Sequence, residues 1–100
     1  MTTPMPMKID FVSPEEKINP DNDNVDVLVR LDDGRVFALL IATPSNIYWC
    51  MDNEAHDYYF GTPPLFVRTL TRRNVENAVG ALIQKPEWLN VYGSLQSGLG

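Results

Sequence analysis

The sequence predicts an α+β domain with a small, mostly antiparallel sheet and two helices, in the order β-β-β-α-β-α. Two strand-like runs, residues 25–31 and 36–43, meet at Asp33-Gly34, a dipeptide typical of β-hairpin turns. A second observation is the helical apolar period of residues 71–85, which ends before Pro86. One hundred residues suit one domain, so we expect a single domain over 1–100, with 1–6 and 94–100 flexible.

A type I′ turn at Asp33-Gly34 would fix the register of the hairpin. It sets Leu31 opposite Val36, Val29 opposite Ala38, Val27 opposite Leu40 and Val25 opposite Ala42. We expect the last helix to pack on this apolar face, over Val27, Val29, Ala38 and Leu40.

The opposite face of this hairpin would also be apolar, which is unusual for an antiparallel sheet with one face in water. An exposed apolar patch on a small protein marks a contact site. We therefore predict a homodimer or a hidden partner surface, with a self-association face made of Leu28, Phe37, Leu39 and Ile41.

The remaining elements follow from local patterns. Residues 7–12 alternate as a first strand, and residues 14–16 form a single helical turn. A short helix over 44–53 begins at Thr43-Pro44, because threonine is a good cap and proline fits the first helical position. Residues 65–70 alternate as a strand, whereas the apolar patch within 87–100 is too short to classify.

Composition and charge narrow the class of protein. A hydrophobic fraction of 44% excludes a disordered chain, and no apolar run approaches the ~20 residues that span a bilayer. Residues 1–7 lack the basic start and apolar core of a signal peptide, so we expect a cytoplasmic protein with no membrane contact. The net charge of −5 argues against nucleic-acid binding and suits a basic protein partner better than an acidic one. The other interpretation is that the acidity only keeps a small protein soluble.

We predict no catalytic, cofactor or metal residues. Cys50 and His56 are single residues of their kind, so a Cys/His zinc site is excluded, and we expect Cys50 to be a buried structural thiol. The carboxylates Asp21, Asp23 and Asp26 lack the glycine and glutamate of a calcium loop, which favours turn chemistry. No glycine-rich nucleotide-binding motif is present.

Arg72 and Arg73 stand at the start of the last predicted helix, where the helix dipole disfavours positive charge. Breaking a local rule can mark function, so one interpretation is a bound anion or an acidic partner. The other is that the fold tolerates a penalty of about 0.3–1 kcal/mol per charge.

An aromatic run surrounds an acidic segment in residues 48–60. Aromatic side chains are enriched in interface hot spots, and surrounding carboxylates would steer a basic partner onto them. The alternative is that these rings fill the core. Our predicted partner-binding residues are Trp49, Asp52, Glu54, Tyr58 and Tyr59.

Several segments together resemble a group of small bacterial α+β proteins, most of them uncharacterised. The segments are Asp33-Gly34-Arg35, Asn46-Ile47, Tyr59-Phe60, 65–68 and 71–83, so the resemblance covers about residues 25–83. Some members are similar to immunity proteins that accompany bacterial toxins, which implies a binding function without catalytic residues. These relatives more often have an acidic first turn where this chain has Arg72-Arg73.

The sequence therefore favours a non-enzymatic protein-binding module, with an immunity protein that neutralises a toxin as its most concrete form. The main alternative is a self-associating structural or accessory protein encoded by a phage or mobile element. An enzyme is the third reading.

Overall fold

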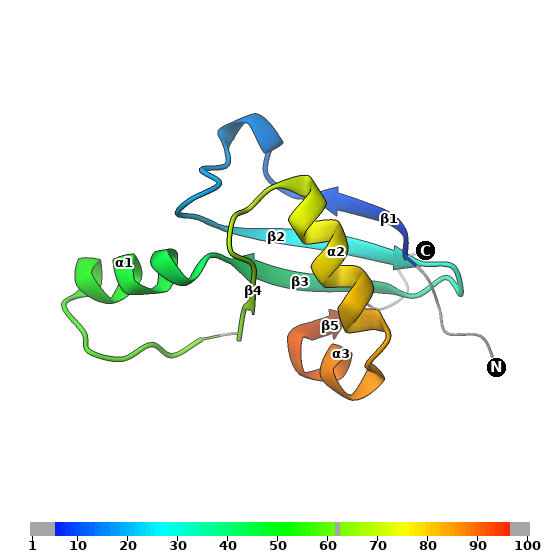
Figure 1. Ribbon diagram of the computed structural model, residues 1–100. Coiled ribbons are helices and arrows are strands. Elements are labelled where there is room, and N and C mark those ends of the chain that lie inside the picture. Colours follow the sequence, from blue (N-terminus) through cyan, green and yellow to red (C-terminus); the bar gives the residue numbers. More distant parts are fainter. Residues whose placement is uncertain (1–5, 62, 97–100) are drawn as a thin grey trace.

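The computed structural model describes residues 6–61 and 63–96 and confirms the α+β class (Figure 1). Over these residues one sheet contains five strands, and three α-helices and one 3₁₀ turn accompany it. The strands are β1 Pro6–Phe11, β2 Asn24–Leu31, β3 Val36–Ala42, β4 Leu65–Phe66 and β5 Gly93–Leu95. The helices are η1 Glu15–Lys17, α1 Pro44–Glu54, α2 Arg72–Ile83 and α3 Pro86–Tyr92.

The strands follow the order β1-β2-β3-β4, and β5 shares the outer edge of β3 with β4. The pairs β1/β2, β2/β3 and β3/β5 are antiparallel, whereas β4 runs parallel to β3. The predicted order of elements matches from β1 to α2, and α3 and β5 follow it.

Two expectations about segments need correction. The predicted strand over 65–70 is reduced to Leu65–Phe66, although Val67 and Leu70 remain buried. Pro6, Ser94 and Leu95, all expected to be flexible, lie in strands, Pro6 in β1 and the other two in β5. Gln96, also expected to be flexible, follows β5 and donates its amide to the Val36 carbonyl at 2.8 Å. The rest of the expected flexible ends, 1–5 and 97–100, lies outside the described residues.

The turn between β2 and β3 is a three-residue loop, Asp32-Asp33-Gly34. The Leu31 amide donates to the Arg35 carbonyl at 2.9 Å, and the Gly34 amide donates to the Leu31 carbonyl at 3.0 Å. Only Gly34 in this loop has a positive φ, +92°, so the type I′ turn, which needs two such residues, is absent. A left-handed glycine after a helical turn is the usual solution for a three-residue hairpin loop.

This loop moves the pairing by one residue, so the predicted register is wrong. The observed pairs include Val25 with Ile41, Val27 with Leu39 and Val29 with Phe37. Because side chains alternate between the two faces of a strand, a slip of one residue exchanges the faces of β3. The predicted core residues Val36, Ala38 and Leu40 therefore lie on the face of the sheet that points away from the helices. The pairs at the two ends, Asn24 with Ala42 and Arg30 with Val36, show the same shift of one residue.

The predicted self-association face is wrong for the same reason. Phe37, Leu39 and Ile41 are buried with 2%, 2% and 0% of their surfaces exposed, and they belong to the core. Leu28 alone of the predicted four lies on the opposite face, with 37% exposed. The homodimer prediction thus loses the surface on which it was based.

The core lies between the sheet and helix α2, which crosses one face of the sheet (Figure 1). Its apolar stripe is buried as the sequence predicts, through Val75, Val79, Leu82 and Ile83. Thr71 caps this helix by accepting a hydrogen bond from the Asn74 amide at 3.2 Å.

Helix α3 adds Leu89 to the core and turns directly into β5 at Gly93. A Cβ atom at Gly93 would lie 2.9 Å from the Leu89 carbonyl oxygen and 3.1 Å from the Phe37 ring. Glycine is therefore required at this position for the chain to pass so close to the core.

The neighbouring leucines 39 and 40 test the register directly. Leu39→Ala should lower the free energy of unfolding by about 2–5 kcal/mol, because it leaves a cavity in the core. Leu40→Ala removes the same atoms from the opposite face and should cost about 1 kcal/mol or less. Chemical denaturation of dilute protein measures both, and a larger loss for Leu40→Ala would contradict the observed register.

Candidate functional site

The clearest candidate surface is a projection that we call the aromatic arm, residues 44–61, made of α1 and the segment that returns toward β4. In Figure 1 helix α1 extends beyond the end of the sheet, away from α2 and α3. Only Asn46 of α1 is buried. The exposed large side chains of the arm are Tyr48 (69%), Trp49 (52%), Tyr58 (57%), Tyr59 (37%) and Phe60 (87%).

Asn46 fixes the base of the arm. Its side-chain amide donates to Asn22 Oδ1 at 3.0 Å, and its Oδ1 accepts from the Asn24 side chain at 2.7 Å. Ser45 adds a bond from its hydroxyl to the Asp21 carbonyl at 2.6 Å. A buried side chain with its polar groups satisfied in this way holds its neighbours in one geometry. The arm is thus anchored by polar contacts at its base, and few of its apolar side chains are buried.

The loop before β2 supplies these anchors through turn chemistry, as the sequence predicts for Asp21 and Asp23, whereas Asp26 lies in β2 and not in a turn. Asp23 accepts hydrogen bonds from the Asn19 amide at 2.9 Å and from the Asn24 amide at 2.8 Å. Its own amide donates to the buried Thr43 hydroxyl at 3.3 Å. The acidic loop therefore joins β2 to the start of α1.

The arm reverses direction at Ala55, which has a left-handed backbone with φ 57° and ψ 40°. Its amide and that of His56 donate to carbonyls of the last helical turn, the His56 amide to Met51 at 2.9 Å. This is the usual way for a helix to end, although glycine is the residue that adopts it with least strain.

Three rings stack along the returning segment. The His56 and Tyr58 rings are 5.0 Å apart and nearly parallel, and the Tyr58 and Phe60 rings meet edge to face at 5.4 Å. The predicted contact segment, residues 48–60, contains His56 and Phe60, but the five predicted partner-binding residues leave both of them out. The period of two in His56, Tyr58 and Phe60, typical of an extended segment, was the signal that could have found them.

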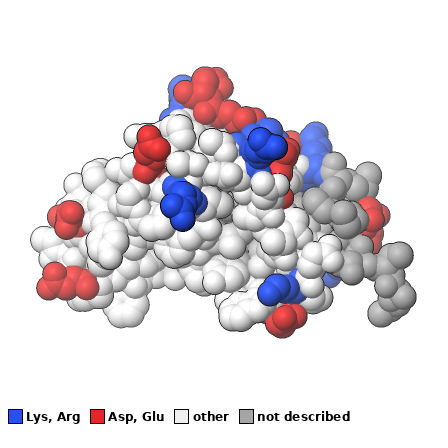
Figure 2. Space-filling view, viewed as in Figure 1, with Lys and Arg blue, Asp and Glu red and all other residues white. Residues whose placement is uncertain are grey.

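The charge of the arm is entirely acidic. Asp52, Glu54 and Asp57 lie in it, and residues 44–61 include no lysine or arginine. In Figure 2 the charged side chains visible at the end of the molecule formed by α1 are all acidic. The arm thus combines exposed rings with a negative field.

All five predicted partner-binding residues lie on the arm, and all five are exposed: Trp49, Asp52, Glu54, Tyr58 and Tyr59. The alternative, in which the rings fill the core, is not what the structure shows. Whether the arm binds a partner stays a prediction.

The cysteine and the histidine of the arm contact different residues. Cys50 is half-buried and not fully buried as expected, and its Sγ lies 3.8 Å from Asn46 Oδ1. The His56 ring instead stacks on Tyr58. Within residues 6–61 and 63–96, no three His, Cys, Asp or Glu side chains gather closely enough to hold a metal ion.

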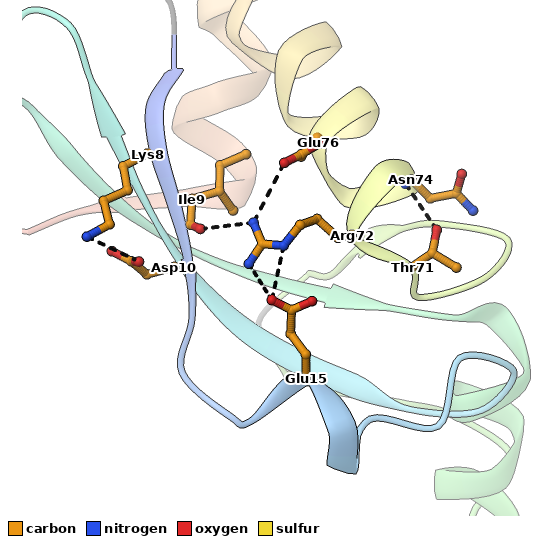
Figure 3. A network of polar contacts seen from close by, with 8 residues as sticks. All are labelled: Lys8, Ile9, Asp10, Glu15, Thr71, Arg72, Asn74 and Glu76. Carbon is orange, nitrogen blue, oxygen red and sulfur yellow. Dashed lines mark hydrogen bonds and ion pairs between the residues drawn. The ribbon is translucent and has the colours of Figure 1, made fainter.

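Arg72, a candidate anion-binding residue, meets carboxylates of its own chain (Figure 3). Its Nε donates to Glu15 Oε1 at 3.0 Å, and its Nη1 lies 3.6 Å from Glu76 Oε2. The guanidinium also lies over the Phe11 ring, 4.7 Å from the centroid, and reaches the Ile9 carbonyl at 3.4 Å. Arg72 therefore joins α2 to β1 and η1, which offsets the unfavourable helix dipole; Arg73 beside it is exposed.

A second apolar surface is a groove of about 380 Å³ between α2, α3 and β4. The Trp88 and Tyr92 rings stack across one turn of α3, 6.3 Å apart. The residues that line the groove are Leu65, Ala78, Ala81, Leu82, Lys85, Trp88 and Tyr92. Lys85 is the one charged group among them, so the groove offers few polar contacts for recognising a small ligand.

Comparison with known proteins leaves these surfaces to be judged on their own geometry. No family model matches the chain, and neither a curated protein nor a solved structure matches it. No helix in the described part of the chain is long and apolar enough to cross a membrane.

The ion pair of Glu15 predicts a specific dependence of stability on pH. The hydrogen bond from Arg72 holds the pKa of Glu15 below its ordinary value of 4.5. The pair therefore contributes stability above 4.5, and this contribution is lost as the pH falls through the lowered pKa. Glu15→Gln should make the melting temperature fall less steeply in acid than it does in the wild type.

Glu16→Gln is the matched control, because it removes an exposed carboxylate one residue away. It should keep the acid dependence of the wild type. If Glu15→Gln and the wild type lose stability in parallel from neutral pH downward, the ion pair does not contribute.

Proposed function

We propose that this chain is a non-enzymatic protein-binding module that holds a basic protein on the aromatic arm. The observation that carries the proposal is the arm itself: five large apolar side chains are exposed on one projecting segment together with three carboxylates. Core packing does not account for them, since α1 buries only Asn46.

Exposed rings of this kind suit a binding surface. Tryptophan and tyrosine bury about 150–250 Å² each when covered, and they lose little conformational entropy in doing so. The His56, Tyr58 and Phe60 stack holds its rings against one another before any partner arrives. A surface arranged in advance loses less free energy on binding.

The carboxylates select the class of partner. Asp52, Glu54 and Asp57 surround the rings, so a basic surface would approach faster and with a preferred orientation. An acidic partner or a nucleic acid would be repelled.

The most concrete form of this proposal is an immunity protein that neutralises a basic toxin. It is supported by the resemblance of residues 25–83 to proteins of that kind, and it agrees with a cytoplasmic site of action. Toxicity of the neighbouring reading frame that is relieved by co-expression of this chain would support it. A neighbourhood without any toxin-like frame would count against it.

The two tryptophans give a matched test of the arm. Trp49 lies on α1 with 52% exposed, and Trp88 lies on α3 with 48% exposed. Once the partner is identified by affinity capture, Trp49→Ala should weaken its binding by about 2 kcal/mol or more, as at an exposed hot spot. Trp88→Ala should leave binding unchanged, and both variants should keep the wild-type melting temperature.

Charge reversal separates steering from contact. Asp52→Lys together with Glu54→Lys should mainly slow association, and the effect should shrink in high salt. Calorimetry measures the binding affinity, and stopped-flow mixing measures the association rate constant. A captured protein that is acidic, or that binds equally well without Trp49, would contradict the proposal.

A further inference from the structure

We infer that the partner of the aromatic arm presents an arginine side chain to it, and that Trp49 and Asp52 of α1 receive the guanidinium group. This rests on the proposed function and names the chemistry by which the arm recognises a basic protein. It follows from the contacts of the chain's own arginines, from the place of Asp52 beside two exposed rings, and from the charge of the arm.

Arg72 shows how this chain binds a guanidinium group. The group lies over the Phe11 ring, 4.7 Å from its centroid, while Arg72 Nε donates to Glu15 Oε1 at 3.0 Å (Figure 3). A ring takes the flat face of a guanidinium group, and a carboxylate accepts from the N–H groups in its plane. The two contacts therefore use different parts of one side chain.

Arg35 repeats this combination at the hairpin loop. Its guanidinium group lies over the Phe37 ring, 5.5 Å from the centroid, and its Nε donates to Asp33 Oδ2 at 2.8 Å. In the part of the chain that the structure describes, these two arginines are the cations that lie over rings, and no lysine does so. A ring and a carboxylate together thus hold arginine in this protein.

Helix α1 presents the same two groups on its exposed surface. Successive helical residues are rotated by about 100°, so Asp52 points between Tyr48 and Trp49, about 40° from the first and about 60° from the second. Tyr48 and Trp49 are 69% and 52% exposed, and Asp52 is exposed as well. Residues three or four apart are neighbours on a helix surface, so one guanidinium group can contact the carboxylate and a ring at once.

The cation that would complete this site is missing from the arm. Residues 44–61 include no lysine or arginine. Within residues 6–61 and 63–96, no ion pair engages the Asp52 carboxylate. A basic partner would supply the missing group, because its positive charge complements the arm.

Arginine suits this site better than lysine does. The guanidinium group is planar and weakly hydrated, so it stacks on a ring and donates to a carboxylate in fixed directions. An ammonium group is compact and strongly hydrated, and it acts as a point charge. A lysine should therefore be attracted to the arm but held less tightly at Trp49.

Two blocked peptides of equal length and charge separate these cations. One alternates arginine with glycine, and the other has lysine in place of each arginine. In a titration of the whole chain followed by NMR at low salt, the arginine peptide should bind at least about fivefold more tightly. It should also shift the indole signal of Trp49 and the amide signal of Asp52.

Asp52→Asn and Glu54→Gln are a matched pair of charge variants. Each removes one carboxylate from α1, but Glu54 points at least about 120° away from both rings around the helix axis. Asp52→Asn should weaken binding of the arginine peptide at least about fivefold and remove most of the preference over lysine. Glu54→Gln should change the binding of either peptide by less than about twofold.

Two substitutions at Trp49 test the ring. Leucine keeps an apolar side chain without a π face, whereas phenylalanine keeps a face. The preference for arginine should be lost in Trp49→Leu and retained in Trp49→Phe. Circular dichroism should show wild-type melting for all of these variants, because the altered side chains are exposed.

Three results would overturn the inference: equal affinity for the two peptides, equal losses in Asp52→Asn and Glu54→Gln, or no binding of the arginine peptide at millimolar concentration. The proposed function would still stand in each case if the captured partner needs Trp49. A captured partner that binds equally well without Trp49 would contradict the proposed function. A preference for the arginine peptide that depends on Asp52 would support the arginine site even then.

Discussion

The left-handed backbone of Gly34 is the constraint on which the rest of this structure depends. With φ at +92° it closes a three-residue loop and makes Leu31 pair with the Arg35 carbonyl. Asp33 supports the loop, since its carboxylate accepts hydrogen bonds from the Arg35 amide at 3.0 Å and from Arg35 Nε at 2.8 Å. The backbone hydrogen bond from Arg35 is the main reason why the pKa of Asp33 lies below 3.8.

The register that follows decides which face of β3 is buried. The observed pairing buries Phe37, Leu39 and Ile41, whereas the alternative would bury Val36, Ala38 and Leu40. Covering a large apolar side chain contributes about 1.5–3 kcal/mol, so the observed face is favoured by several kcal/mol. Turn geometry and side-chain burial thus agree on one pairing, which is the consistency expected of a sequence that specifies one fold.

The elements that could be predicted from the sequence are those with local causes. The Thr71 cap, the apolar stripe from Val75 to Ile83 and the hairpin itself all follow from neighbouring residues. The register of the hairpin could not be predicted in this way, because Asp-Gly suits both a two-residue type I′ turn and the end of a three-residue loop. The larger side chains on one face of β3, Phe37, Leu39 and Ile41, are the signal in the sequence that favours the observed register.

Helix α3 escaped prediction because seven residues are too few for a clear helical period. Its close packing at Gly93 depends on Phe37, far away in the sequence. The arm shows the reverse case. The weak apolar periodicity of its helix and its consecutive aromatic residues indicated an exposed segment. The polar anchor at Asn46, however, depends on Asn22 and Asn24, and no local sequence pattern connects those residues to it.

The molecule thus separates two surfaces that have different physical origins. The arm exposes rings because it extends beyond the sheet, and polar contacts at its base hold it there (Figure 1). The second surface is the face of the sheet that carries Leu28, Ala38 and Leu40, and it is exposed because α2 and α3 pack on the other side of the sheet. Neither surface shares residues with the other, so each can be changed without disturbing the core.

The most direct test of this account is the hairpin register in solution, measured by backbone nuclear Overhauser contacts across β2 and β3. The structure predicts contacts that join Asp26 to Leu40 and Leu28 to Ala38. Contacts that join Val27 to Leu40 and Val29 to Ala38 would contradict it. They would exchange the core face of β3 with the face that lies away from α2.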